Sequence, residues 1–336
     1  MTHSKKYASS TDVARRAGVS QSAVSRTYQP GGSVSAETRR KVLEAAAELD
    51  YRPSAIPRIM LTHRSHLVAI VVGGLYNPFY TAVLEEFTIK LQNTGHQVLL
   101  VHVDSGHSLD AVIPRLASYR VDAIVSALAI LSPASAEELA RFKIPVVSFN
   151  TPCHNEWVSS VCCDNIGAAR QLADLFLARG SRRFGYISGP ANSPANQERF
   201  EGYRQRLAEH GIDEIRFAQA DFRYEGGYKA ALEMFSGGNR PDAVFCANDL
   251  VAMGTIDALR RDIGLRVPED VIIAGFDDIP AASWSAYDLT TLVHDGTRMV
   301  DEALAILRTA SANHTSAGDV RCVVPATLIE RATTRR

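Results

Sequence analysis

SSTDVARRAGVSQSAVSRTYQ, residues 9–29, has the pattern of two short helices joined by a single glycine. Ser9 stands before the first helix and Asp12 follows three positions later, the spacing at which two side chains cap the helix start reciprocally. Gly18 ends that helix, because glycine adopts the left-handed conformation of a sharp turn at little cost. Ser20 then caps the second helix, so the segment is predicted to be a helix-turn-helix.

The second of these helices is predicted to carry an exposed polar face. Ala23 and Val24 turn back onto the first helix, which leaves Gln21, Ser22 and Arg26 pointing outward. Arginine pairs with guanine and glutamine with adenine through two hydrogen bonds, each pair adding about 1–3 kcal/mol of discrimination. We therefore expect base contacts from this face. The plainer alternative is a solvated helical hairpin, because Arg and Gln are also ordinary surface residues.

A third helix is predicted after Ser35, within AETRRKVLEAAAELDYRP. Its apolar residues recur at helical spacing and are expected to close a three-helix core: Val42, Leu43, Ala46 and Leu49. The headpiece defined in this way spans residues 8–53. Residues 1–66 carry 11 Lys or Arg and 5 Asp or Glu, whereas the remainder has a net charge of −7. The basic end is therefore suited to contact phosphates.

The headpiece resembles the lactose repressor (LacI/GalR) family of bacterial transcription regulators. The resemblance rests on DVARRAGVSQSAVSR (residues 12–26) and on VSAETRRKVLEAAAELDYRPSA (residues 34–55). It implies DNA contacts: a phosphate contact from Ser20, base-edge contacts from Gln21, Ser22 and Arg26, and a backbone contact near Gln29. The family usually has Val-Leu-Asn after the arginine, where this chain has Thr-Tyr-Gln.

Residues 54–66 correspond to the hinge of that family. The resemblance implies a short helix that orders on DNA and, paired in a dimer, wedges an apolar side chain into the minor groove. Met60 stands at the wedge position. Pro57 replaces the usual alanine, and it fits the first turn of a helix capped by Ser54, where its missing N–H loses no hydrogen bond. A plain linker is the alternative, because Pro57 pushes Ile56 away from helical angles.

From Leu67 onward, short apolar runs alternate with amphipathic stretches. The runs are LVAIVV (67–72), QVLLVHV (97–103), DAIVSAL (122–128) and PVVSFN (145–150), then RFGYIS (183–188), DAVFCAND (242–249) and VIIAGFDD (271–278). Helices are expected from near Phe79, Ser108 and Ala134, and from Asn165, Asn196, Glu225 and Asp249. This alternation predicts parallel sheets with helices on both faces, in two similar halves.

The expected fold is a small all-α helix-turn-helix headpiece joined to an α/β core, residues 67–330, that resembles the two-subdomain type I periplasmic-binding-protein fold. One subdomain is expected at about 67–163 and 295–321, the other at about 164–292 and 322–330. Ligands bind between such halves, at the carboxyl ends of the strands. The core is thus predicted to bind an effector and to form the dimer.

Polar residues at the strand ends suit a polyhydroxy ligand, and aromatic rings such as Phe79 can cover the apolar face of a sugar. The resemblance implies six further effector positions: Asn150, Arg199, Phe222, Asn248, Asp277 and His294. Asn150 stands where Asp is common and His294 where Gln is common, which favours a sugar acid or another polyhydroxy acid over a neutral sugar as the ligand.

Each of these positions also has a structural alternative. Phe79 and Phe222 are as well explained by packing in the core as by stacking on a ligand. His294 is as well explained by a structural hydrogen bond at a crossover between the halves as by a ligand contact. Asp249 and Asp278 are expected to cap helices, with their neighbours Asn248 and Asp277 nearer the ligand.

Other functional classes lack their motifs. The sequence has no GxxxxGK[ST], GxGxxG, GxSxG or HExxH, so neither catalysis nor a cofactor is expected. The five cysteines lack metal-ligand spacing and are interpreted as reduced packing residues, with a redox-sensing Cys162–Cys163 pair as the alternative; no metal site is expected. No apolar run spans a membrane and no signal-peptide core is present, which favours a cytoplasmic protein.

Together these features predict a sequence-specific transcription regulator, foremost a repressor, that binds a palindromic operator on double-stranded DNA as a homodimer. Dimerisation is expected because one headpiece makes too few contacts for genomic specificity. A sugar or sugar acid would control DNA affinity by favouring one closure of the two halves. The alternative is a solute-binding protein or sugar-sensing module without DNA control.

Overall fold

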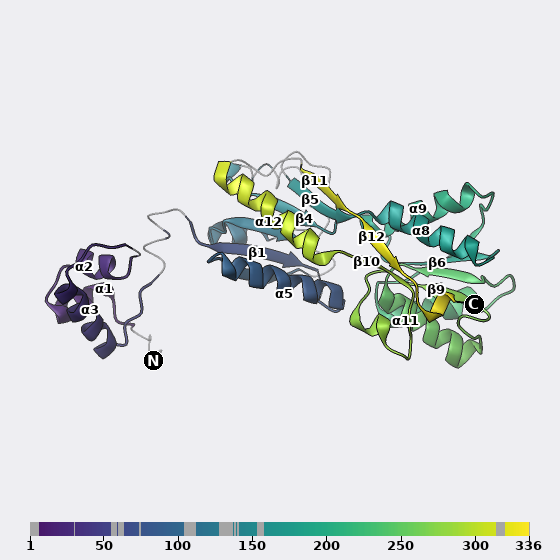
Figure 1. Cartoon of the computed structure of the whole chain (residues 1–336), viewed down its shortest axis with the longest axis horizontal. Coiled ribbons are helices and arrows are strands. Elements are labelled where there is room, and N and C mark those ends of the chain that lie inside the picture. Colours follow the sequence, from purple (N-terminus) through teal and green to yellow (C-terminus); the bar gives the residue numbers. More distant parts are fainter. Residues whose placement is uncertain are drawn as a thin grey trace. The chain divides into compact units, whose positions relative to one another are not determined.

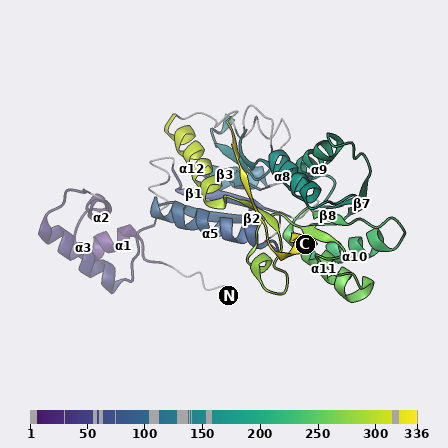
Figure 2. The same ribbon diagram turned by 45° about the vertical axis from the view of Figure 1, so that its right-hand side comes forward.

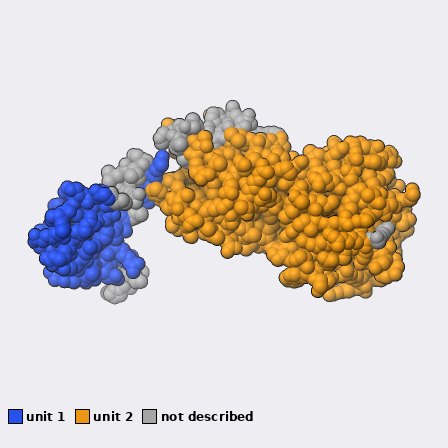
Figure 3. All heavy atoms as spheres, viewed as in Figure 1, with its two compact units in different colours: residues 1–64 blue, residues 65–336 orange. Residues whose placement is uncertain are grey.

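The computed structural model describes residues 7–29, 31–54, 59, 64–73, 75–103, 112–127, 137, 139, 141–152, 158–313 and 320–335. The chain divides into two compact units, Met1–Arg64 and Ser65–Arg336 (Figure 3). No helix among the described residues is both long and apolar enough to cross a membrane.

The first unit holds the three predicted helices: α1 Ser10–Ala17, α2 Gln21–Thr27 and α3 Ala36–Glu48 (Figure 1). The reciprocal cap between Ser9 and Asp12 is present, and Gly18 has a φ of 67° in the left-handed region. Val13, Val24 and Val42, one from each helix, are fully buried and form the centre of the core.

One part of this predicted core is wrong. Leu43 is 47% exposed, and Ala45 lies in the core beside Val42 and Ala46. Leu43 follows Val42 directly, so it projects about 100° further around the helix, toward solvent.

In the second unit, the first lobe is built on a six-stranded parallel sheet in the order β11-β5-β4-β3-β1-β2. Its strands are β1 Leu67–Val72, β2 Gln97–His102, β3 Ala123–Ser126, β4 Val146–Phe149, β5 Val158–Cys163 and β11 Arg321–Val324. Helices α5 Pro78–Asn93 and α12 Gly296–Asn313 share one core with Val68 and Ile70, whereas α6 Ile113–Ser118 packs with Ala69 and Val71. Alternate side chains of β1 therefore point to opposite faces of the sheet.

The second lobe has a four-stranded parallel sheet in the order β7-β6-β8-β9. These strands are β6 Phe184–Ser188, β7 Ile215–Gln219, β8 Ala243–Cys246 and β9 Ile272–Ala274. One face is covered by α8 Asn165–Ala178 and α9 Pro194–Ala208, the other by α10 Tyr224–Phe235 and α11 Asp249–Ala258 (Figure 2). Short helical turns follow at η2 Leu259–Ile263, η3 Pro280–Ser283 and η4 Ala332–Thr334.

Three connections join the lobes: after β5, between β10 Thr291–His294 and α12, and between β11 and β12 Ala326–Ile329. Strands β10 and β12 pair antiparallel with each other. All four residues of β11 pair with β5, so the third connection falls at Pro325, after the expected boundary at 321/322.

The seven apolar runs quoted above contain β1 to β4, β6, β8 and β9. Ser108 and Ala134, where helices were expected to begin, lie outside the described residues.

Candidate functional site

The exposed face of α2 carries the three residues predicted to contact bases. Gln21, Ser22 and Arg26 are all exposed. The Gln21 Nε2 atom donates to Ser10 Oγ at 2.9 Å, and Arg26 Nε donates to the Ser22 carbonyl at 3.3 Å. Ser20 caps the helix by accepting the Ala23 amide through its hydroxyl, which lies 2.9 Å from Ser22 Oγ. These residues form one polar, solvent-facing surface that carries the cationic side chain of Arg26.

The carboxyl end of α2 is held by a residue that the sequence analysis missed. Arg39 Nη1 donates to the Thr27 carbonyl at 2.9 Å, and Nη2 donates to the Gly32 carbonyl at 3.5 Å. A cation at this end also matches the negative end of the helix dipole. Thr27 is buried and its hydroxyl donates to the Ala23 carbonyl, so it occupies a core position. Arg39 therefore positions the polar face, although nothing in its local sequence distinguishes it from its surface neighbour Arg40.

The remaining DNA-contact predictions fall at the edges of this unit. Gln29 is exposed and its amide donates to Ser25 Oγ at 3.5 Å. Met60, the expected wedge, and Pro57 lie outside the described residues.

In the second unit, the Asp277 carboxylate is the meeting point of the two lobes. The Asn77 amide of the first lobe donates to Asp277 Oδ2 at 2.7 Å. The orientation of that amide is fixed, because its oxygen caps α5 by accepting the Phe79 N–H at 3.0 Å. His294 Nε2 lies 2.9 Å from Asp277 Oδ1, and Arg199 Nη2 lies 3.8 Å from the same oxygen. All of these polar side chains are buried.

Arg199 is tied to the second lobe through most of its guanidinium group. Nε donates to Asn165 Oδ1 at 2.9 Å, and Nη1 donates to the Ala247 carbonyl at 2.6 Å. The guanidinium lies 3.6 Å from the centre of the Phe276 ring, a cation–π contact. Its charge is balanced by Asp277, so this buried ion pair has no net charge.

His294 is a neutral imidazole in this cluster. Burial lowers its pKa, outweighing the opposing effect of Asp277. Because a carboxylate only accepts hydrogen bonds, the hydrogen must be on Nε2, which leaves Nδ1 as an acceptor. Nδ1 is buried and has no hydrogen-bond partner among the described residues. The ring stacks on Phe79 of the first lobe, with centroids 4.4 Å apart.

Asn150 supplies a second buried acceptor without a partner among the described residues, its Oδ1 atom. The residue has a φ of 53°, a left-handed conformation that Asn tolerates better than most side chains. Its amide nitrogen donates to the Tyr80 hydroxyl at 3.4 Å. Tyr80 follows Phe79 on α5, and burial raises its pKa to about 12, so the hydroxyl remains protonated.

Asn248 and Phe222 form a second, adjoining group. Asn248 caps α11 by accepting the Val251 N–H at 2.9 Å and donates to the Phe222 carbonyl at 3.1 Å. Phe222 has a φ of 64° and packs against Gly189, where an added Cβ would come within 2.2 Å of its ring. Both groups of the Asn248 amide are therefore engaged by the protein itself. Since Ala247 precedes Asn248 and bonds to Arg199, this group adjoins the Asp277 cluster.

The expectation that Asp249 and Asp278 cap helices is wrong. Asn248 performs that role, and Asp249 is the first residue of α11. The Asp249 carboxylate accepts the Ile279 N–H at 2.9 Å and the Thr291 hydroxyl at 2.6 Å, and burial raises its pKa well above the usual range. Asp278 forms an ion pair with Arg331 at 2.8 Å. The role of neither carboxylate can be predicted from its spacing in the sequence, because its hydrogen-bond or ion-pair partner lies far along the chain.

The structure thus gathers Phe79, Arg199, Asp277 and His294 in one cluster, with Asn150 joined to it through Tyr80. Three further members are Asn77, Asn165 and Phe276. Asn77 opens NPFY (residues 77–80), one of the strand-end motifs from which ligand binding is expected, although the residue itself was not named as a contact. Asn165 and Phe276 carried no such signal, since a helix-start Asn and a strand Phe are common structural residues.

Comparison with known proteins covers both units. Residues 11–54 match the model described as bacterial regulatory proteins, lacI family, and residues 173–334 match a periplasmic binding protein-like domain. The chain is 32% identical to the HTH-type transcriptional regulator CelR of Thermobifida fusca, covering 95% of this chain and 96% of that protein. It is 30% identical to the HTH-type transcriptional repressor CytR of Escherichia coli (strain K12), covering 88% and 87%.

A solved structure titled transcriptional regulator CelR-cellobiose complex superposes with a TM-score of 0.72 at 30% identity, covering 97% of this chain and 99% of the other.

Proposed function

The chain belongs to the lacI family of bacterial regulatory proteins, and on that premise we propose that it represses transcription by binding a palindromic operator as a homodimer under the control of a small effector. Its relatives CelR and CytR are named as transcriptional regulators, not as enzymes. It would act in the cytoplasm, where bacterial DNA is transcribed. The observation that carries the effector control is the hydrogen bond from Asn77 to Asp277, which joins the lobes within a buried polar cluster.

Binding to the operator would use the exposed face of α2. Arg26 and Gln21 are the residue types that read guanine and adenine, and both side chains reach solvent. Their present partners are a serine hydroxyl and a backbone carbonyl of the same headpiece, which a base edge can replace. Two headpieces from a homodimer would read the two halves of a palindrome.

Control by the effector would follow from linkage between two sites. An effector that contacts both Asp277 and the Asn77 region binds one arrangement of the lobes more tightly than another. Any resulting change in operator affinity must equal the change that the operator causes in effector affinity. The relative CytR is named a transcriptional repressor, which supports repression as the function that the effector would control.

For the effector, the geometry favours a neutral sugar over a sugar acid. In this cluster, two buried atoms have no hydrogen-bond partner among the described residues, Asn150 Oδ1 and His294 Nδ1. Both are acceptors, so the ligand must present donors such as hydroxyl groups. The charge that would anchor a carboxylate, on Arg199, is already balanced by Asp277. Phe79 offers an aromatic surface beside them. The match to a CelR–cellobiose complex is consistent with a carbohydrate ligand.

Selection of random duplex DNA by the purified protein, with and without pools of neutral sugars and sugar acids, tests this proposal. Enrichment of a palindrome that is reduced or abolished by a neutral sugar is the expected result. Enrichment that only a sugar acid alters would overturn the assigned ligand class. If no sequence is enriched under any condition, the result would contradict operator binding and support the alternative, a sugar-sensing module without DNA control. Analytical ultracentrifugation with the enriched duplex measures whether two chains bind per site.

A further inference from the structure

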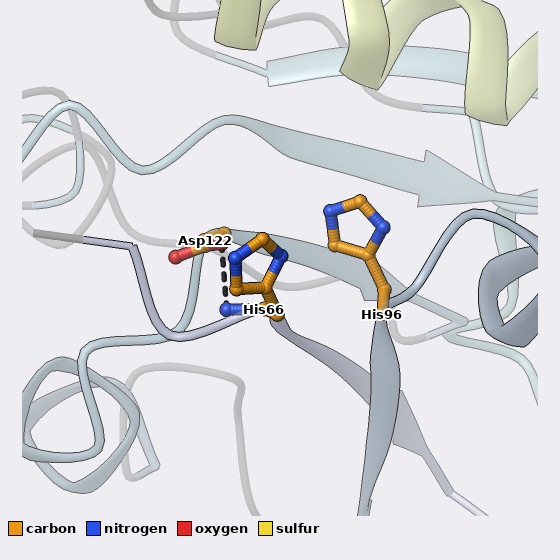
Figure 4. A group of neighbouring side chains, drawn as sticks. All are labelled: His66, His96 and Asp122. Carbon is orange, nitrogen blue, oxygen red and sulfur yellow. Dashed lines mark hydrogen bonds between the residues drawn. The ribbon is translucent and has the colours of Figure 1, made fainter. Parts of the chain in front are cut away.

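A second group of polar side chains lies at the opposite, amino-terminal edge of the first lobe's sheet. Strand β1 pairs in parallel with β2, Leu67 opposite Gln97, and with β3, Val68 opposite Ala123. The residues immediately before these strands are therefore brought together although they are far apart in sequence. They are His66, His96 and Asp122, shown in Figure 4.

Backbone hydrogen bonds fix His66 in this group. The Asp122 carboxylate accepts the N–H groups of Ser65 and His66, each at 2.9 Å, and the Ser65 hydroxyl at 3.1 Å. The His66 carbonyl accepts the Gln97 N–H at 2.7 Å. These contacts hold His66 at a φ of 57°, in the left-handed region, and set its ring beside that of His96 (Figure 4). The ring centroids are 5.6 Å apart.

The hydrogen bonds around His96 determine which of its nitrogens is free. Its Nδ1 lies 3.1 Å from the Thr94 hydroxyl, and that hydroxyl donates its single hydrogen to the Leu91 carbonyl at 2.8 Å. Thr94 must then accept from Nδ1–H, because a hydroxyl has only one hydrogen. The Nε2 lone pair of His96 is left available. A metal-binding histidine is oriented in this way when its other ring nitrogen donates to a neighbouring oxygen.

His66 completes the set with an imidazole that makes no hydrogen bond to any described residue. Within the described part of the chain, its one ring contact is with His96. One ligand atom from each of His66, His96 and Asp122 lies within 4.8 Å of the other two, and all three residues are half-buried. We propose that these three side chains bind a divalent transition-metal ion such as zinc, a site additional to the DNA-binding and effector sites.

The chemistry of the ligands selects the class of ion. Two imidazoles and one carboxylate suit borderline ions such as Zn²⁺, whereas Mg²⁺ and Ca²⁺ prefer oxygen ligands alone. Zinc–ligand distances of about 2.0–2.1 Å put tetrahedral ligands roughly 3.3 Å apart, so the side chains would close in on the ion by rotation. Three protein ligands leave a fourth position for water.

Such a site would stabilise the start of the second unit, close to the point in the chain where the first unit ends. Arg64 is the last residue of the first unit, and His66 is the second residue of the other. A bound ion would attach this first stretch of the core to β2 and to the residue before β3. It would therefore resist fraying of the chain at the point where the connection to the headpiece begins.

Zinc binding can be measured on the untagged, full-length protein without DNA, so the result does not depend on the proposed repressor function. The protein is stripped with a chelator and titrated with ZnCl₂ against a chromophoric competitor. His66→Asn is a suitable variant because Asn tolerates the left-handed backbone, and His96→Asn removes the second imidazole. His210→Asn, at an exposed histidine of the second lobe, is the matched control. Circular dichroism in the absence of metal checks that each variant is folded.

We expect one zinc ion per chain. Its affinity should be at least about tenfold lower in His66→Asn and in His96→Asn, and unchanged in His210→Asn. Cobalt substitution should give the visible absorption of a tetrahedral ion, and the variants should lose it. Absence of zinc binding in the wild-type protein would overturn the proposal. So would an affinity that stays the same in His66→Asn and His96→Asn, because the ion would then reside elsewhere.

Discussion

The Asn77 amide donates a 2.7 Å hydrogen bond to the Asp277 carboxylate, so that the cap of α5 in the first lobe is bonded directly to the loop after β9 in the second. Asp277 also accepts from His294. A ligand that enters this cluster must compete with, or add to, the bond that holds the lobes together. Under the proposed function, effector binding and lobe arrangement would therefore be coupled at this carboxylate.

Replacing that carboxylate should separate effector binding from DNA binding. Asp277→Asn removes the charge that faces Arg199 and His294, and a charged hydrogen bond is worth about 2 kcal/mol. We expect the Kd for the best-binding sugar to rise about 30-fold, with operator affinity in the absence of sugar retained. Calorimetry and fluorescence anisotropy measure the two quantities. Asp213→Asn, at an exposed position of the same lobe, should change neither; an unchanged sugar affinity in Asp277→Asn would remove this carboxylate from the site.

Arg26 should determine operator selectivity. Arg26→Ala is expected to weaken binding to the selected operator by about 1–3 kcal/mol, roughly 5- to 150-fold, and to leave sugar binding unaltered. Anisotropy titrations with the operator and with a scrambled duplex give the selectivity ratio. Arg15→Ala removes another exposed arginine, from α1, and serves as the control for loss of charge. If both variants reduce affinity equally on both duplexes, Arg26 contributes only electrostatic attraction.

Lowering the pH should weaken both folding stability and sugar binding through His294. Its pKa is lowered in the folded protein by burial, so the unfolded chain binds the proton more readily. The stability that this group contributes is present above the ordinary histidine pKa of about 6.5 and is lost as the pH falls toward the folded value. Protonation would also remove the Nδ1 acceptor. Urea unfolding and sugar titrations between about pH 7 and pH 5 test this. In His294→Gln, the corresponding part of the pH dependence should disappear.

Two glycines allow α10 and α11 to pack closely. A Cβ at Gly254 would lie 2.0 Å from the Tyr224 carbonyl oxygen, and one at Gly227 would lie 2.3 Å from that of Val251. Gly254→Ala should therefore push the helices apart and lower the free energy of unfolding by about 1–3 kcal/mol or more. Gly238→Ala, where the added methyl group meets open space, should have little effect in the same urea titration. Equal stabilities for the two variants would contradict the close packing.

Cys162 and Cys163 should resist oxidation and alkylation in the native protein. Burial raises the pKa of both thiols to about 12, so almost no thiolate forms at neutral pH. Iodoacetamide followed by peptide mass spectrometry should label Cys322 before this pair, since Cys322 is only half-buried. In guanidinium chloride, all three should react at similar rates. Rapid native labelling of the pair would instead support the redox-sensing alternative.

Local chemistry was sufficient for the helix ends of the headpiece, but not for the core position of Ala45 or for the contacts of Arg39. The Ser9–Asp12 cap, the Gly18 turn and the Ser20 and Ser35 caps each depend on residues within four positions, so the sequence predicts them directly. The strands that were predicted lie within runs of six to eight mostly apolar residues. In β5 (VSSVCC) and in the edge strand β7 (IRFAQ), which were missed, polar residues interrupt the apolar pattern. Strands β10, β11 and β12 were missed because they are short and their pairing partners are distant in sequence.

The sequence alone therefore determined the helix-turn-helix, the α/β class of the core and the family resemblance that named candidate effector positions. Only the tertiary structure decided what the side chains at and beside those positions contact: that Asn248 rather than Asp249 caps α11, that Arg199 is balanced by Asp277, and that Asn77 bridges the lobes. Likewise, His66, His96 and Asp122 have no ligand spacing in the sequence and meet only through the register of three parallel strands. Caps and turns depend on neighbouring residues, whereas the partners of a buried side chain are brought together by strand pairing and lobe packing.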